Sequence, residues 1–204
     1  MAGDFQKKSR SALSSLPFRV SRAPLADEGY TREQQDLLTF LHNLVLQNPE
    51  LAVPEIEAAL VEYPALPELR NFMYTALQKM GESERAYEAI EETVRAFPEY
   101  LFARIAYAEY LIFFERLEEI PRLFQSRFEL ELLYPLRDVF HISEVISFYY
   151  IMGRYYFLIG KYSKFEFCSD LLNELEEDDQ RARHLSELRE QYYAALYRVI
   201  ISSS

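Results

Sequence analysis

The chain has 204 residues, of which 50% are hydrophobic and 27% are charged, with only 5 glycines. This length and composition are typical of a folded, helix-rich protein with one core and tails. The formal net charge is −11, and because residues 1–24 carry +4, the rest of the chain carries −15. An acidic body of this size repels phosphate backbones, so we expect no binding of nucleic acid.

The first 30 residues are basic and contain several serines. We expect residues 1–30 to form a disordered tail. The stretch also weakly resembles an organelle transit peptide or a secretion leader, although it lacks the apolar run of a secretory signal. Because tail and body have opposite charges, we expect the tail to lie along the body or in a groove on it, where it competes with ligands.

After this tail, a dipeptide of an aromatic residue and proline recurs at similar intervals along the sequence. These dipeptides occupy positions 63–64, 97–98 and 134–135, so the first two are 34 residues apart and the third follows after 37. A period of 34 is the length of a helix-turn-helix repeat. The first dipeptide closes a predicted helix pair over 31–64, and the longer last interval indicates an insertion or an irregular end.

The next two pairs are predicted over 67–98 and 101–134. In the first of them, apolar residues recur with helical spacing until Gly81 ends the helix, and Ser83 is predicted to cap the second helix. In the other, Pro121 is expected in the first turn of the second helix, where proline is tolerated.

The stretch 149–162 holds six aromatic residues and two glycines. Arg154 interrupts its apolar run, which is also too short for a membrane span, so we expect none. We interpret the stretch as a packing motif in a fourth helix pair over 146–178, in preference to an aromatic ligand cage. The residues with motif spacing are Tyr149, Met152, Gly153, Tyr156, Gly160, Tyr162 and Phe165.

This spacing resembles the tetratricopeptide repeat (TPR), in which a large aromatic residue is followed by a Leu-Gly-like pair and then by Tyr. The resemblance covers 31–178. It departs from the family pattern at Glu115, which stands at the turn where Gly81 and Gly160 stand in their units, and at Phe165, which replaces a small alanine.

The resemblance implies an all-α fold, a right-handed α-solenoid of about four antiparallel helix pairs. A last amphipathic segment, 179–201, is predicted to be a helix that caps the exposed end of the array.

We find no sequence pattern that indicates catalysis, a metal ion or a cofactor, so we expect no enzyme activity and no bound cofactor. The three histidines are scattered, and there is neither a cysteine pair nor a glycine-rich phosphate loop. His141-x-x-Glu144 is interpreted as a solvated helix start. The acidic run 174–179 is interpreted as a solvated loop, with cation binding as the alternative.

Cys168 is the single cysteine of the chain. It has large apolar neighbours, so we expect an inert, buried thiol rather than a reactive one. A chain that cannot form an internal disulfide suits a reducing compartment, and we therefore expect a cytoplasmic location.

The TPR resemblance implies a concave face formed by the first helix of each pair, and residues at i, i+3, i+7 and i+10 of those helices are the candidate contacts. The partner-binding candidates are Asn71, Thr75, Gln78, Phe102, Ile105, Glu109, Tyr150, Arg154 and Phe157, with Glu68, Ile112 and Ser147 at the same register. Packing within the array is the alternative role for the apolar members of this set. Of the whole set only Asn71 and Arg154 suit a carboxylate clamp, so we do not expect the clamp of heat-shock chaperone adaptors.

The leading hypothesis is a scaffold, adaptor or chaperone-like module that binds a peptide or helix of a partner protein in this groove. The 15% aromatic content favours a second hypothesis, a structural subunit that self-associates into a homo-oligomer. An accessory subunit of a larger enzyme is a third hypothesis, which the sequence does not separate from the first.

Overall fold

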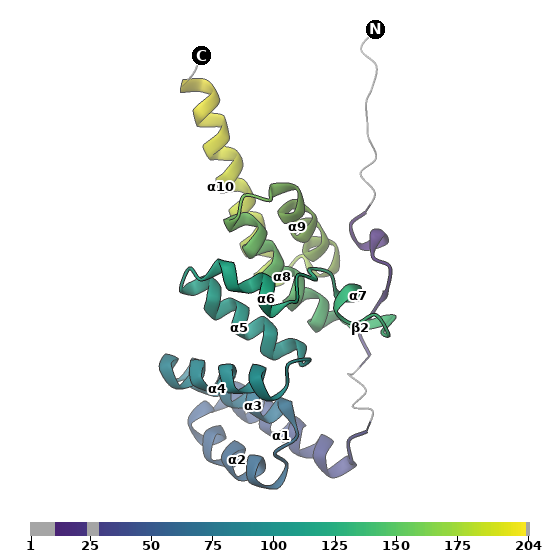
Figure 1. Cartoon of the computed structure of the whole chain (residues 1–204), viewed down its shortest axis with the longest axis vertical. Helices are drawn as coiled ribbons and strands as arrows, with labels where there is room; N and C mark the ends of the chain where they lie inside the picture. The colour runs from purple at the N-terminus through teal and green to yellow at the C-terminus, as the bar shows by residue number, and fades with distance from the viewer. Residues whose placement is uncertain (1–10, 24–28, 203–204) are drawn as a thin grey trace. The chain divides into compact units, whose positions relative to one another are not determined.

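We describe residues 11–23 and 29–202 of the chain in a computed structural model. The chain divides into two compact units. We call residues 23–126 the middle unit, and we call residues 11–22 with residues 127–204 the terminal unit. Both are built mainly from α-helices that follow one another along the chain, as Figure 1 shows, so the expectation of a mainly helical protein is confirmed.

Consecutive helices of the middle unit contact each other in antiparallel order, and α1 also contacts α3. These elements are α1 (Arg32–Gln47), α2 (Pro49–Glu62), α3 (Pro67–Lys79), α4 (Ser83–Ala96), α5 (Leu101–Phe113), η2 (Leu117–Glu119) and α6 (Ile120–Leu123). A core of leucine, isoleucine, valine and alanine side chains, including Leu41, Ile56 and Leu69, lies between α1, α2 and α3. The apolar residues that recur with helical spacing in these segments therefore face the core, as predicted.

Side chains and prolines at the helix starts explain where the first helices begin. Thr31 and Gln34 form a capping box at α1, in which the backbone amide of Gln34 donates to the Thr31 hydroxyl over 3.2 Å. Asn48 caps α2, whose first residue is Pro49. Ser83 was expected to cap α4, but it is the first residue of that helix, and Glu82 before it makes no capping hydrogen bond through its side chain.

The same turn ends α3, α5 and α8 (Ile142–Leu158). Gly81, Glu115 and Gly160 have φ of 77°, 57° and 70°, and the amide after each donates to a carbonyl five residues earlier. This is the Schellman arrangement, which favours glycine because a side chain is strained at positive φ. The turn at Glu115 thus has the glycine-type geometry although its residue is not glycine.

The second helix expected in 101–134 is broken into short pieces. α6 has four residues and ends where Gln125 and Ser126 both take positive φ. The helical conformation resumes only at α7 (Leu130–Leu133), in the terminal unit. Pro121 lies in the first turn of α6 as predicted, but the two consecutive left-handed residues stop the helix soon afterwards.

The terminal unit contains α7, α8, α9 (Tyr162–Glu176) and α10 (Gln180–Ser202), with consecutive contacts between the last three. It also contains a parallel two-stranded sheet of β1 (Arg19–Ser21) and β2 (Val139–His141), in which Val20 pairs with Phe140. The expectation of an all-α fold is therefore corrected by this small sheet.

The sheet also shows that the prediction of a disordered tail was wrong for some of its residues. Residues 11–22 form a segment that we call the strap. Its element η1 (Leu13–Ser15) and strand β1 lie on the terminal unit, and the buried ring of Phe18 contacts that of Phe140 at 4.7 Å between centroids. Residues 1–10 and 24–28, which the prediction also covered, lie outside the described residues.

The strap is held by the acidic run at the end of α9. The Glu174 carboxylate accepts hydrogen bonds from the Ser11 hydroxyl at 2.5 Å and from the Ala12 and Leu13 amides at 2.9 Å. Arg22 donates to Glu176 at 2.9 Å. The run was interpreted as a solvated loop, and this was wrong: its first residues are helical and carry the partners that fix the strap.

Gly153 lets three helices of the terminal unit approach closely. A Cβ atom at this position of α8 would lie 2.7 Å from Leu185 Cδ1 on α10 and 3.2 Å from Cys168 Cβ on α9. Both distances are shorter than normal carbon contacts. Cys168 is buried as predicted, and burial raises the pKa of its thiol well above the usual value.

Candidate binding site

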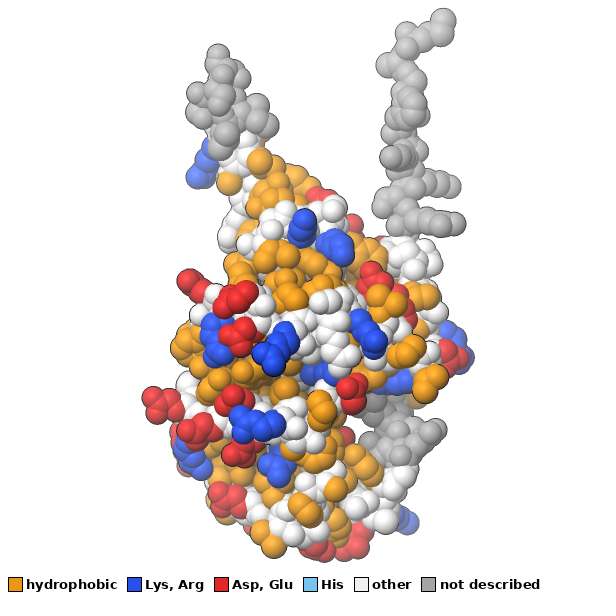
Figure 2. All heavy atoms as spheres, viewed as in Figure 1, with side chains coloured by type: hydrophobic (Ala, Val, Ile, Leu, Met, Phe, Trp, Pro, Cys, Tyr) orange, Lys and Arg blue, Asp and Glu red, His pale blue; other side chains and the backbone are white. Residues whose placement is uncertain are grey.

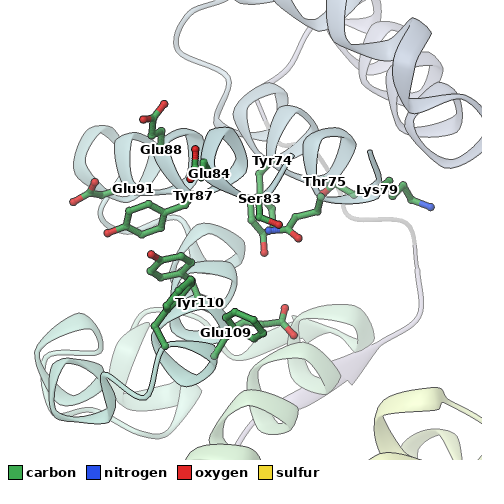
Figure 3. A pocket seen from close by; sticks show the side chains of 13 residues that line it. Tyr74, Thr75, Lys79, Ser83, Glu84, Tyr87, Glu88, Glu91, Glu109 and Tyr110 are labelled. Atoms are coloured by element: carbon green, nitrogen blue, oxygen red, sulfur yellow. The ribbon is translucent and has the colours of Figure 1, made fainter. Parts of the chain in front are cut away.

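A cavity of about 890 Å³ lies in the middle unit, beside the ends of α3 and α5 and the N-terminal half of α4 (Figure 3). Its lining is Tyr74, Thr75, Gln78 and Lys79 from α3, Ser83, Glu84, Tyr87, Glu88 and Glu91 from α4, and Glu109, Tyr110, Phe113 and Phe114 from α5 and its C-terminal cap. Every one of these residues belongs to the same unit.

Aromatic rings from α4 and α5 form one wall of the cavity. Tyr87 and Tyr110 stack with their centroids 3.7 Å apart, and Figure 3 shows their rings facing one another. Phe114 continues the wall at 4.3 Å from Tyr110, and Phe113 contacts Phe114 at 4.9 Å. The two phenylalanines, Phe113 and Phe114, remain 77% and 51% exposed, so this wall ends in large apolar side chains that the described residues leave largely uncovered.

Arg116 fixes the outer end of this wall. Its guanidinium donates to both carboxylate oxygens of Glu119, at 2.6 and 2.9 Å, and to the Tyr87 hydroxyl at 3.5 Å. A bidentate pair of this kind holds the planar guanidinium in one orientation. The positive charge next to the tyrosines is thus already matched by a carboxylate.

The remaining charge of the lining is mostly negative. It has four carboxylates, from Glu84, Glu88, Glu91 and Glu109, and one ammonium group, from Lys79. Burial, followed by the charge of Glu109, raises the pKa of Tyr74 to about 12. This phenol is therefore neutral at pH 7, and the negative charge of the site comes from its carboxylates.

The structure brings together three of the partner-binding candidates, because Thr75, Gln78 and Glu109 all line this cavity. Asn71, one turn earlier on α3, is half-buried, and its backbone carbonyl accepts a hydrogen bond from the Thr75 hydroxyl at 2.9 Å. Phe102 is half-buried and Ile105 is only 8% exposed, so α5 offers little of Ile105 to a partner.

The candidates on α8 belong to the terminal unit and are packed there. Tyr150 shares a hydrogen bond of 2.8 Å with His184 of α10, and Arg154 lies over the Tyr150 ring at 5.6 Å. Phe157 contacts Phe165 at 5.1 Å. Helix α10 thus occupies part of the α8 face that was expected to line the groove.

The predicted candidates do not include the aromatic wall or most of the acidic lining. Tyr87 and three of the four carboxylates come from α4, a second helix, whereas the candidates lie on first helices only. Tyr110 and Phe113 lie on α5, a first helix, but outside the predicted register. The signal was present in the sequence, since Glu84, Glu88 and Glu91 recur at i, i+4 and i+7 beside Tyr87 and therefore share one side of a helix.

His141 and Glu144 start α8, as predicted, with the Glu144 carboxylate accepting from the His141 amide at 2.9 Å. The predicted solvation is wrong, because Glu144 is buried and binds both Nη atoms of Arg137, at 3.0 and 2.7 Å. Across residues 11–23 and 29–202, the structure has no group of three His, Cys, Asp or Glu residues that could hold a metal ion.

No helix in the described part of the chain combines the length and the apolar character needed to cross a membrane. Comparisons of the chain with protein-family models, with curated proteins and with solved structures give no match.

Proposed function

We propose that this chain is a non-catalytic, TPR-like binding module that holds a segment of a partner protein in the cavity beside α3, α4 and α5. The observation that carries this proposal is the aromatic wall of Tyr87, Tyr110, Phe113 and Phe114 in a cavity of about 890 Å³. This volume lies within the range in which protein pockets bind ligands, roughly 300–1,000 Å³.

Exposure of the wall supports a binding role over a purely structural one. Two adjacent phenylalanines that remain 77% and 51% exposed keep apolar area in contact with water, which is unfavourable by about 25 cal/mol for each Å². Aromatic side chains at a concave surface are also the residues that contribute most to binding energy in protein interfaces. A partner segment that covers them gains this energy.

Site-specific photo-crosslinking tests the proposal. A benzophenone amino acid is introduced at Gln78, an exposed position of the cavity, and as a control at Glu57, an exposed position of α2 outside it. Irradiation in the native source should give a discrete cross-linked product from position 78 and not from position 57. Equal products from both positions, or no product from position 78, would contradict the proposal.

A second candidate function, self-association, is favoured by an apolar surface on α10. The large apolar side chains exposed on the described part of its C-terminal half are Tyr193, Leu196, Tyr197 and Ile201, with exposures of 49%, 40%, 66% and 58%. Figure 2 shows hydrophobic side chains along this helix below the grey atoms. Their spacing places them on one broad face, which suits a helix-to-helix contact between two copies.

Multi-angle light scattering distinguishes this candidate. Self-association through α10 predicts a dimer mass that falls to the monomer mass of 24.2 kDa when Leu196 and Tyr197 are both replaced by Glu. A monomer at tens of micromolar wild-type protein would count against it.

A further inference from the structure

We propose that the segment bound in this cavity is basic, with arginine or lysine residues interleaved with apolar ones. This inference rests on the proposed function, because it names the chemistry of the partner at the same site. Two independent properties of the lining lead to it, namely its excess of carboxylates over ammonium groups and the apolar surface next to them.

The charge of the lining favours a cationic occupant. Its four carboxylates against one ammonium group give a formal charge of −3. Glu91 is paired at 3.4 Å with Arg95, which lies outside the lining, so the lining together with this arginine carries −2. The described structure gives Glu84 and Glu88 no ion pair or hydrogen bond through their side chains. Like charges four residues apart on a helix repel each other, and a bound cation removes this repulsion.

The positions of the carboxylates show where cations would bind. Glu84 of α4 and Glu109 of α5 line the same cavity as Tyr87 and Tyr110. Figure 3 shows Glu88 pointing away from Tyr110. The pair formed by Glu84 and Glu109 therefore lies next to the aromatic wall on two different helices, and we assign the main cation contacts to these two residues.

The apolar surface between these charges suits arginine and lysine in particular. Their aliphatic stems pack along apolar surfaces while the charged group remains at a polar edge. The exposed rings of Phe113 and Phe114 offer such a surface, and aromatic faces also attract cations. An acidic segment would meet repulsion from the same carboxylates, and a nucleic acid would meet it from its phosphates.

Selection from a phage library of random peptides on the full chain tests the inference, and it does not require the natural partner to be identified. The selected peptides should be enriched in arginine and lysine, and their affinity is then measured by fluorescence polarisation. The cavity variant carries Glu84→Gln with Glu109→Gln. The matched control carries Glu55→Gln with Glu57→Gln, two exposed residues of α2 outside the cavity, so both variants lose two negative charges.

The cavity variant should bind the selected peptides about tenfold more weakly, which corresponds to two charge pairs at a partly exposed site. The control should bind within about twofold of the wild type, because general attraction by net charge is screened at physiological salt. Equal losses in both variants would overturn the inference, since binding would then follow net charge and not the site.

A third variant, Gln78→Trp, fills the cavity without changing its charge. It therefore tests the binding site separately from the basic chemistry of the bound segment. Selected peptides that are neutral or acidic but lose binding in this variant overturn the basic chemistry and leave the proposed site intact. Peptides that bind all three variants equally overturn both. If no peptide is selected, the inference fails, and crosslinking at position 78 decides the proposed function separately.

Discussion

Replacing Gly153 with Ala tests how closely α8, α9 and α10 pack. The added methyl carbon would lie 2.7 Å from Leu185 Cδ1 and 3.2 Å from Cys168 Cβ, whereas carbon atoms pack at about 3.5–4.0 Å. The Leu185 side chain is completely buried, so it has little free space into which it can rotate away from the added methyl group. Cys168 Cβ is fixed to the α9 backbone, so relief there requires a shift of the helix.

The expected magnitude is a balance of two terms. Overpacking a well-packed core costs about 1–3 kcal/mol, and alanine gains about 1 kcal/mol over glycine within a helix. Because two neighbours are too close and both are buried, we expect the packing cost to exceed the helix gain. With the packing cost in the upper part of this range, about 2–3 kcal/mol, the net loss in unfolding free energy of the terminal unit should be about 1–2 kcal/mol.

Thiol labelling of Cys168 measures this loss locally. The buried thiol reacts only when the surrounding helices open, so its labelling rate in low urea reports the opening free energy of this part of the terminal unit. Far-UV circular dichroism in urea gives the transition of the whole chain for comparison. In a Leu185→Ala background the clash with the leucine is absent, and the cost of Gly153→Ala should fall by about 1 kcal/mol. Stabilisation of the wild type by Gly153→Ala, as helix propensity alone would give, would refute the packing argument.

Three further predictions concern single side chains. Glu115→Gly should raise the unfolding free energy in urea by about 1 kcal/mol, because a left-handed residue loses its strain; no gain would show that the turn is not left-handed. Hydrogen bonds from the strap lower the pKa of Glu174, so the strap should stay attached above the usual carboxyl range and detach as pH falls through that lowered pKa. Amide exchange in the strap checks this, and a Glu174→Gln variant should lack the acid dependence. Arg137→Ala should cost about 3 kcal/mol by leaving Glu144 buried and unpaired, whereas Arg19→Ala, whose ion pair is exposed, should change stability by less than about 1 kcal/mol; equal effects would mean that burial does not decide the cost.

The sequence predicted α1 to α5 of the middle unit well, because their apolar periodicity and their breakers agree. Gly81 ends α3 and Pro98 follows α4, as the spacing indicated. The equivalence of Glu115 with the two glycines is also confirmed, through the shared positive φ of the three residues. The solenoid arrangement that the TPR resemblance implies stays a prediction.

Features that depend on contacts distant in the sequence could not be predicted in the same way. Strand β1 has three residues without a clear alternating pattern, and its partner β2 begins only at Val139. The strap is fixed by Glu174, a carboxylate that by sequence alone is one of several in an acidic run. Only part of the cavity lining was predicted, for a related reason. Its aromatic wall combines side chains from α4 and α5, and the sequence does not determine how these two helices are rotated relative to each other.

An NMR titration of the isotope-labelled full chain with a selected peptide tests the central claim most directly. We predict that amide shifts on binding cluster at the cavity, around Thr75 and Gln78 of α3, Glu84 of α4 and Tyr110 of α5. Shifts confined to α1 and α2, or to residues 127–204, with none around the cavity, would contradict the account.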